Sequence, residues 1–117
     1  MIKTPIKTTE DYNKIVGERL RFFRELHNIT QTEIAQKLGY TSTGTWSLME
    51  NGIRGLNKTK MAEAAKILGT YVEVLTSETE MTKDELIDMN TLMDIRTNPK
   101  HPRYKELLKF LKTAKEK

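Results

Sequence analysis

Polar side chains with a capacity for hydrogen bonding gather near the middle of this 117-residue chain. Gln31 stands at the start of a predicted helix, where unpaired backbone N–H groups and the helix dipole already favour a phosphate. Thr43, Gly44 and Thr45 open a later predicted helix, and residues so small and polar suit a close approach to base edges better than they suit helix stability. Arg54 lies on the loop that follows. The chemistry predicted for this cluster is hydrogen bonding to nucleic acid.

Two short helices joined by a turn would carry these side chains. Thr30 caps the first helix and Gly39 ends it, while the second helix covers about residues 43–51 and ends at Gly52. Such a pair is a helix-turn-helix, in which the second helix lies in the major groove of DNA. The same pattern also fits an αα-corner in a small helical bundle, which would have a structural role only. The polar residues favour the DNA-binding interpretation.

Hydrophobic spacing predicts further helices around this pair. Apolar residues recur every three or four positions from residue 12 to residue 26 and form the stripe of a first helix. Asn57 caps a fourth helix, and a short fifth helix covers residues 72–75. No segment alternates as a strand would. The predicted fold class is therefore all-α, with five helices in a DNA-binding domain that covers residues 1–77.

Residues 78–117 are predicted to form a helical hairpin. One helix covers about residues 81–95, and two prolines within residues 98–102 break the chain. A last helix then carries an apolar face opposite a row of lysines. Two such helices expose too much apolar surface to be stable alone, so the hairpin should pack against the domain or against its copy in another subunit.

The net charge of +4 conceals three blocks of alternating sign. Residues 1–60 carry 10 Lys and Arg against 6 Asp and Glu, residues 61–95 carry 2 against 8, and residues 96–117 carry 8 against 2. A basic first block suits a polyanion, and the later blocks can pair within or between chains. Solvated helix faces explain the same charges equally well.

Several functional classes are not expected. The chain has no cysteine, which excludes disulfides and thiolate metal sites, and no apolar stretch approaches the length of a membrane span. His27 and His101 have no second ligand or carboxylate at catalytic spacing, and the serines lack a nucleophile elbow. We therefore expect a cytoplasmic protein that is not an enzyme and that binds no metal, cofactor or membrane.

The run from residue 30 to residue 75 resembles the Cro/CI (XRE) family of helix-turn-helix domains, and Asn-Gly-Ile-Arg-Gly-Leu-Asn at residues 51–57 is similar to the phage lambda repressor domain of that family. The resemblance implies a repressor that binds a palindromic operator in double-stranded DNA as a homodimer. It also implies phosphate contacts from the motif's glutamine and two asparagines, and a base contact from Arg54. The DNA-binding residues predicted in all are Gln31, Ser42, Thr43, Gly44, Thr45, Ser47, Asn51, Arg54 and Asn57.

The chain departs from this family in the turn. Between Gly39 and Ser47 it has one residue more than the usual spacing, which shifts the assignment of base contacts within residues 42–45 by up to one position. Trp46 and Met49 match buried positions of the family, so we expect them in the core. Glu50 is expected to cap or pair inside the domain.

The C-terminal segment resembles, by pattern more than by identities, the helical-hairpin multimerisation module of the SinR/SinI regulators. This resemblance implies homodimerisation through interlocked hairpins, and an antagonist with a similar hairpin could compete for the same surface. The implied apolar seam consists of Leu86, Met89, Leu92, Leu107, Leu108, Phe110 and Leu111. A hairpin folded back on its own domain is the alternative.

Three further alternatives stay open at the level of sequence. The protein could be the DNA-binding antitoxin of a toxin–antitoxin pair, with the hairpin holding the toxin. It could instead be an antagonist that acts through the hairpin and has lost DNA binding. The lysine-bearing arm of residues 1–7 could wrap the duplex or could fray without a function.

Overall fold

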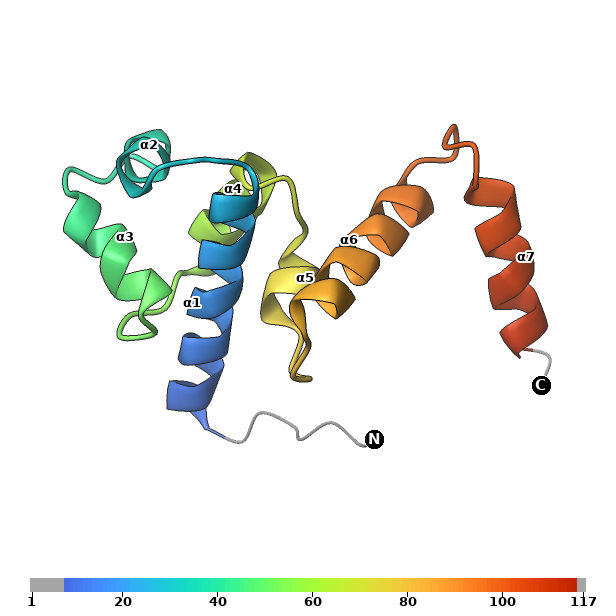
Figure 1. Cartoon of the computed structure of the whole chain (residues 1–117), viewed down its shortest axis with the longest axis horizontal. Helices are drawn as coiled ribbons and strands as arrows, with labels where there is room; N and C mark the ends of the chain where they lie inside the picture. The colour runs from blue at the N-terminus through green and yellow to red at the C-terminus, as the bar shows by residue number, and fades with distance from the viewer. Residues whose placement is uncertain (1–7, 116–117) are drawn as a thin grey trace.

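Seven α-helices and no strand make up residues 8–115, the part of the chain that this computed structural model describes (Figure 1). The prediction of an all-α fold is confirmed for these residues, and the predicted N-terminal arm lies outside them. In chain order the helices are α1 (Thr9–Leu26), α2 (Gln31–Lys37), α3 (Thr43–Glu50), α4 (Lys58–Ile67), α5 (Val72–Thr76), α6 (Lys83–Thr97) and α7 (Tyr104–Lys115).

Five helices, α1, α2, α3, α4 and α6, begin where a side chain accepts from a backbone N–H group that lacks a helical partner. Thr30 Oγ1 accepts from the N–H of Glu33 at 3.0 Å, and the Glu33 carboxylate accepts from the N–H of Thr30 at 3.3 Å, which completes a capping box. Asn57 caps α4 by accepting from the N–H of Lys60 at 2.8 Å. Just beyond α2, Gly39 has a φ of 82°, a left-handed conformation that favours glycine. The predicted caps and the predicted stop are confirmed.

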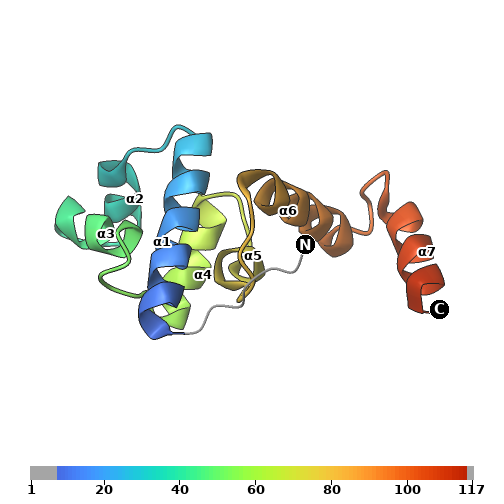
Figure 2. The same cartoon turned by 60° about the horizontal axis from the view of Figure 1, so that its bottom comes forward.

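The hydrophobic core surrounds α1, which has α2 and α3 on one side and α4 and α5 on the other (Figures 1 and 2). The apolar stripe of α1 packs against both groups, so this helix joins the two halves of the domain. Trp46 and Met49 are buried as the sequence predicted. The largest fully buried side chains are those of Trp46, Phe23, Leu20, Ile34, Leu38, Leu68, Leu75 and Val74.

The backbones of α1 and α3 approach each other without a side chain between them at Gly17. A Cβ atom at this position would lie 2.5 Å from the carbonyl oxygens of both Met49 and Glu50. Gly52, just beyond α3, is equally close to the backbone of α1, since its Cβ would lie 2.5 Å from Lys14 Cα. Two glycines therefore fix how closely α3 lies against α1.

A buried arginine joins α1 to the end of α5. Arg19 donates from Nη1 to the Ser77 carbonyl and from Nη2 to the Thr79 carbonyl, both at 2.7 Å. Nη1 also lies 3.3 Å from the Val74 carbonyl oxygen and 3.4 Å from that of Leu75. Some of these oxygens belong to carbonyls at the C-terminal end of α5 that have no N–H partner within the helix. A cation beside them stabilises the negative end of the helix dipole. Burial lowers the pKa of the Arg19 guanidinium, which nevertheless stays charged because arginine titrates so far above neutrality.

α6 contacts the domain from Leu86 to Thr97, whereas α7 projects away from it (Figures 1 and 2). Leu86, predicted for the hairpin seam, is buried in the core of the chain itself, and Met89 packs partly against that core. Asn90 accepts from the Thr70 hydroxyl at 2.6 Å, and Tyr71 donates to Asp94 at 2.5 Å. The hydrogen bond to Asp94 raises the pKa of the Tyr71 hydroxyl. α6 is thus fixed to the end of α4 and the start of α5.

Replacing Gly17 by alanine tests the close approach of α1 and α3. We expect Gly17→Ala to lower the free energy of unfolding by about 1–3 kcal/mol, because the two carbonyls can yield only if α3 shifts. Urea-induced unfolding followed by circular dichroism measures the change. Gly44→Ala is the control, since it also replaces a helical glycine but its Cβ would meet the Ser42 hydroxyl at 3.3 Å. Equal losses of stability in the two variants would contradict the prediction.

Candidate nucleic-acid interface

An open hollow lies where the C-terminal end of α1 meets the start of α2 and the outer face of α3. It has a volume of about 930 Å³. We call it the α1–α3 hollow. Four of the predicted DNA-binding residues come together on its walls, namely Gln31, Thr43, Ser47 and Asn51. The complete lining consists of Arg21, Arg24, Glu25, Asn28, Ile29, Thr30, Gln31, Thr32, Thr43, Ser47 and Asn51.

The other predicted DNA-binding residues lie outside this hollow. Ser42 is the N-cap of α3 and accepts from the N–H of Gly44 at 3.1 Å. Thr45 is half-buried on the same helix, whereas Arg54 is exposed on the loop that follows. Asn57 is also exposed, and its side chain is already used to cap α4. The structure therefore divides the predicted set into a group within the hollow and a group along the start of α3 and the next loop.

One carboxylate organises the hollow from beneath. The side chain of Glu50 is only 3% exposed, and it accepts hydrogen bonds from three different helices. Trp46 Nε1 donates to Oε2 from one turn earlier in α3. Arg24 in α1 donates from Nε to Oε2 at 2.5 Å and from Nη2 to Oε1 at 3.1 Å. Gln31 in α2 donates from Nε2 to Oε1 at 3.0 Å. Glu50 is thus a paired, structural residue, as the sequence indicated.

This arrangement fixes the side chain of Gln31. A glutamine amide has two N–H donors and an acceptor oxygen, so the hydrogen bond to Glu50 leaves one N–H available for another partner. Because Glu50 cannot move without breaking its other hydrogen bonds, the amide of Gln31 is held in one direction. Arg24 also donates from Nη1 to the Ile29 carbonyl at 2.8 Å, which holds the loop before α2. The result is a preorganised polar group at the start of α2.

The turn between α2 and α3 contains most of residues 40–43, the segment in which the sequence predicts the extra residue. α2 ends at Lys37 and α3 begins at Thr43, so only the last position of that segment is helical. The hydroxyls of Thr32 and Thr43 are 3.2 Å apart and join the two helices at the hollow. Lys60 of α4 donates to the Leu38 carbonyl at the end of α2. The structure thus positions Ser42 and Thr43, while which of them reads a base stays a prediction.

Sequence reasoning missed four polar residues that line the hollow from α1 and its end, namely Arg21, Arg24, Glu25 and Asn28. Arg21 and Arg24 project from the last turns of α1, and Asn28 follows in the left-handed conformation with a φ of 55°. Their spacing of three and four residues would place them on one face of a helix. That signal is present in the sequence, but it lies outside the two helices of the motif.

The described part of the chain contains neither of two other features, a metal site and a membrane-spanning helix. Within residues 8–115, no group of three His, Asp or Glu side chains is arranged to hold a metal ion. No helix in that part is long and apolar enough to cross a membrane. Its buried side-chain nitrogen and oxygen atoms all have hydrogen-bond partners, so no polar group points into the core without a partner.

Replacing Glu50 by glutamine tests the role of the buried carboxylate. We expect Glu50→Gln to lower the free energy of unfolding by about 3–5 kcal/mol, because the largely buried guanidinium of Arg24 would lose its close counter-charge and keep only the exposed Glu25, 3.9 Å away. Chemical denaturation measures this loss. Glu63→Gln is the matched control, since Glu63 is exposed and lies 3.5 Å from Lys60 Nζ, so its loss should change stability little. A Glu50→Gln protein as stable as the control would show that the carboxylate does not organise the three helices.

Comparison with known proteins agrees with this geometry. Residues 15–78 match the family described as the helix-turn-helix domain. No curated protein matches the chain at a significant level. Among solved structures, one similar chain belongs to the complex titled SinR protein/SinI protein complex. The two share 18% sequence identity and a TM-score of 0.56, and the match covers 87% of this chain and 99% of that chain.

At 18% identity the structural match supports the likeness of fold and nothing finer. It extends beyond the motif, since it includes most of the chain. The family match is the more specific finding, because its 64 residues, from 15 to 78, are more than half of the 117 in the chain. They contain α2, α3 and the Glu50 network that joins them to α1. The chain therefore belongs to the helix-turn-helix domain family.

Proposed function

We propose that this chain is a transcriptional repressor of the Cro/CI type, which binds a palindromic operator as a homodimer. The observation that carries the proposal is the α1–α3 hollow, where Gln31, Thr43, Ser47 and Asn51 meet around a preorganised amide. In the proposed complex, the start of α2 faces the phosphate backbone and α3 lies in the major groove. Membership of the helix-turn-helix family supports this placement.

Phosphate contacts and base contacts come from different parts of the surface. Gln31 and Asn51 lie in the hollow and bind phosphates, which position the protein but carry no sequence information. The first turn of α3 and the loop after it read bases. Thr45 and Arg54 are the residues of that group whose side chains we assign to base edges. Each of the two groups can be tested separately.

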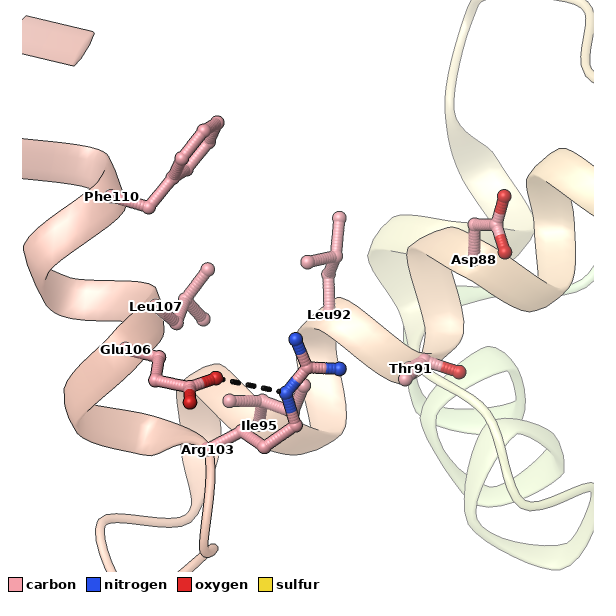
Figure 3. Close-up of a pocket in the computed structure, with 8 residues that line it drawn as sticks. All are labelled: Asp88, Thr91, Leu92, Ile95, Arg103, Glu106, Leu107 and Phe110. Carbon is pink, nitrogen blue, oxygen red and sulfur yellow. Dashed lines mark hydrogen bonds and ion pairs between the residues drawn. The ribbon is translucent and has the colours of Figure 1, made fainter.

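A groove between α6 and α7 supports the homodimer (Figure 3). It has a volume of about 510 Å³ and is lined by Leu92, Ile95, Leu107 and Phe110, together with the Arg103–Glu106 ion pair, which lies between the two helices. Figure 3 shows Leu92, Leu107 and Phe110 facing the open space between the two helices. Leu92 is 51% exposed, Leu108 48% and Phe110 68%. Large apolar side chains left so open favour a partner that covers them.

We assign this seam to a second copy of the chain. α6 is rich in acidic residues and α7 in basic residues, so two hairpins can place opposite charges beside each other as well as burying their leucines. The seam as proposed omits Leu86, which the core already covers. An antagonist with a similar hairpin would compete for the same groove and release the operator.

The operator contacts are tested by selection of bound sites from random DNA. We expect a palindromic consensus whose half-sites lie about 34 Å apart along the duplex. Arg54→Ala and Thr45→Ala should each weaken specific binding by roughly 1–3 kcal/mol and relax the preference at one base position. Gln31→Ala should instead weaken binding to every sequence alike. Lys66→Ala, an exposed lysine on α4, is the control. Unchanged affinity and preference in both Arg54→Ala and Thr45→Ala would refute the base contacts.

The dimer is tested by single substitutions in the seam. Deletion of the hairpin is unsuitable, because it would also remove Leu86 from the core. We expect Phe110→Asp and Leu92→Asp to sediment as monomers with helical content intact, since both side chains are exposed. Leu26→Asp, which places the same charge at an exposed leucine of α1, should leave the dimer unchanged. Seam variants that still sediment as dimers would exclude this interface.

A further inference from the structure

An exposed ion pair at the C-terminal end of α1 forms part of the wall of the α1–α3 hollow, although it belongs to neither helix of the motif. Arg21 Nε donates to Glu25 Oε1 at 2.5 Å, while the two side chains remain 63% and 54% exposed. Both line the hollow together with Gln31 and Ser47. A phosphate bound there would therefore come close to this pair.

Glu25 lies between two guanidinium groups, one bound to the core and one held only at the surface. Its Oε1 is 2.5 Å from Arg21 Nε and 3.9 Å from Arg24 Nη2. Arg24 is bound to the buried Glu50 and cannot leave it without disturbing the core. Arg21 is held only at the surface. The hydrogen bond from Arg21 lowers the pKa of Glu25, so the carboxylate is ionised at neutral pH. A negative charge thus stands at the edge of a hollow that otherwise suits an anion.

We propose that Arg21 binds a phosphate of the DNA backbone and that Glu25 occupies its guanidinium in the free protein as an internal substitute for that phosphate. The inference rests on the proposed function and adds to it a binding residue outside the two motif helices. When DNA binds, the guanidinium exchanges a carboxylate oxygen for a phosphate oxygen, and Glu25 turns to solvent. No covalent bond changes.

The exchange is easy for the protein because an exposed ion pair contributes little to stability. A guanidinium binds phosphate through parallel N–H donors, in the geometry that it also uses for a carboxylate. Glu25 is already about half exposed and needs no rearrangement of the core to leave. Every phosphate that binds Arg21 must first displace Glu25 from it. Glu25 therefore lowers the affinity for all DNA sequences alike and leaves the choice between sequences to the start of α3.

The salt dependence of binding to a fluorescently labelled duplex of random sequence tests this exchange, since phosphate contacts govern that dependence. In the wild type, each contact of Arg21 with a phosphate takes away the closest partner of Glu25, whose Oε1 then keeps only the more distant Arg24 at 3.9 Å. In Glu25→Gln, the contact of Arg21 with a phosphate leaves no negative charge behind. We therefore expect tighter binding and a plot of log K against log salt that is steeper by about one. In an Arg21→Gln background, the same Glu25→Gln change should have a much smaller effect, because no guanidinium is released.

Glu18→Gln is the matched control. Glu18 is an exposed residue of α1, so its replacement by glutamine removes the same charge. It lies outside the α1–α3 hollow. Thermal unfolding of each variant verifies that the fold is retained. If Glu25→Gln and Glu18→Gln steepened the plot equally, or if Glu25→Gln acted equally in both backgrounds, this inference would be overturned while the proposed function stood. A wild-type protein without affinity for the duplex would overturn both.

Discussion

The carboxylate of Glu50 is the group on which the arrangement of the motif depends. A buried carboxylate is unfavourable unless donors surround it, and here the donors come from α1, α2 and α3 at once. Each donor has its own direction, so the three helices can satisfy the charge in few relative positions. The same hydrogen bonds that stabilise the core therefore also orient Gln31 at the surface.

Glycine provides a second constraint on the same pair of helices. Gly17 and Gly52 let the backbone of α1 meet the C-terminal half of α3 and the residue beyond it, with no side chain between them. The Arg24–Glu50 ion pair then joins the same two helices through side chains. Close backbone contact and a directional ion pair together set the distance and the rotation of α3. The exposed face of α3 can then carry small polar residues, because the buried side of the helix makes the contacts with α1.

Local signals in the sequence predicted most of the helix boundaries, because caps and stops act within a single turn. Thr30, Gly39 and Asn57 are examples. Long-range contacts could not be predicted in this way. Arg19 has as partners the carbonyls of residues 55 to 60 positions later, and nothing in their sequence marks them as acceptors. The pairing of Arg21 with Glu25 follows from helical spacing, but its place beside the hollow follows only from the fold.

The sequence of α6 shows why the hairpin was the less predictable part. Its apolar residues do not form one stripe, because the helix packs against the core of the domain on one side and against α7 on another. Leu86 faces the core of the domain, whereas Leu92 and Ile95 line the groove against α7. Hydrogen bonds from Thr70 to Asn90 and from Tyr71 to Asp94 fix the helix along this length. A partner bound in the groove would therefore be held by the same helix that packs on the DNA-binding domain. In the proposed dimer, the contact between hairpins would consequently set the spacing of the two recognition helices without the need for a separate linker.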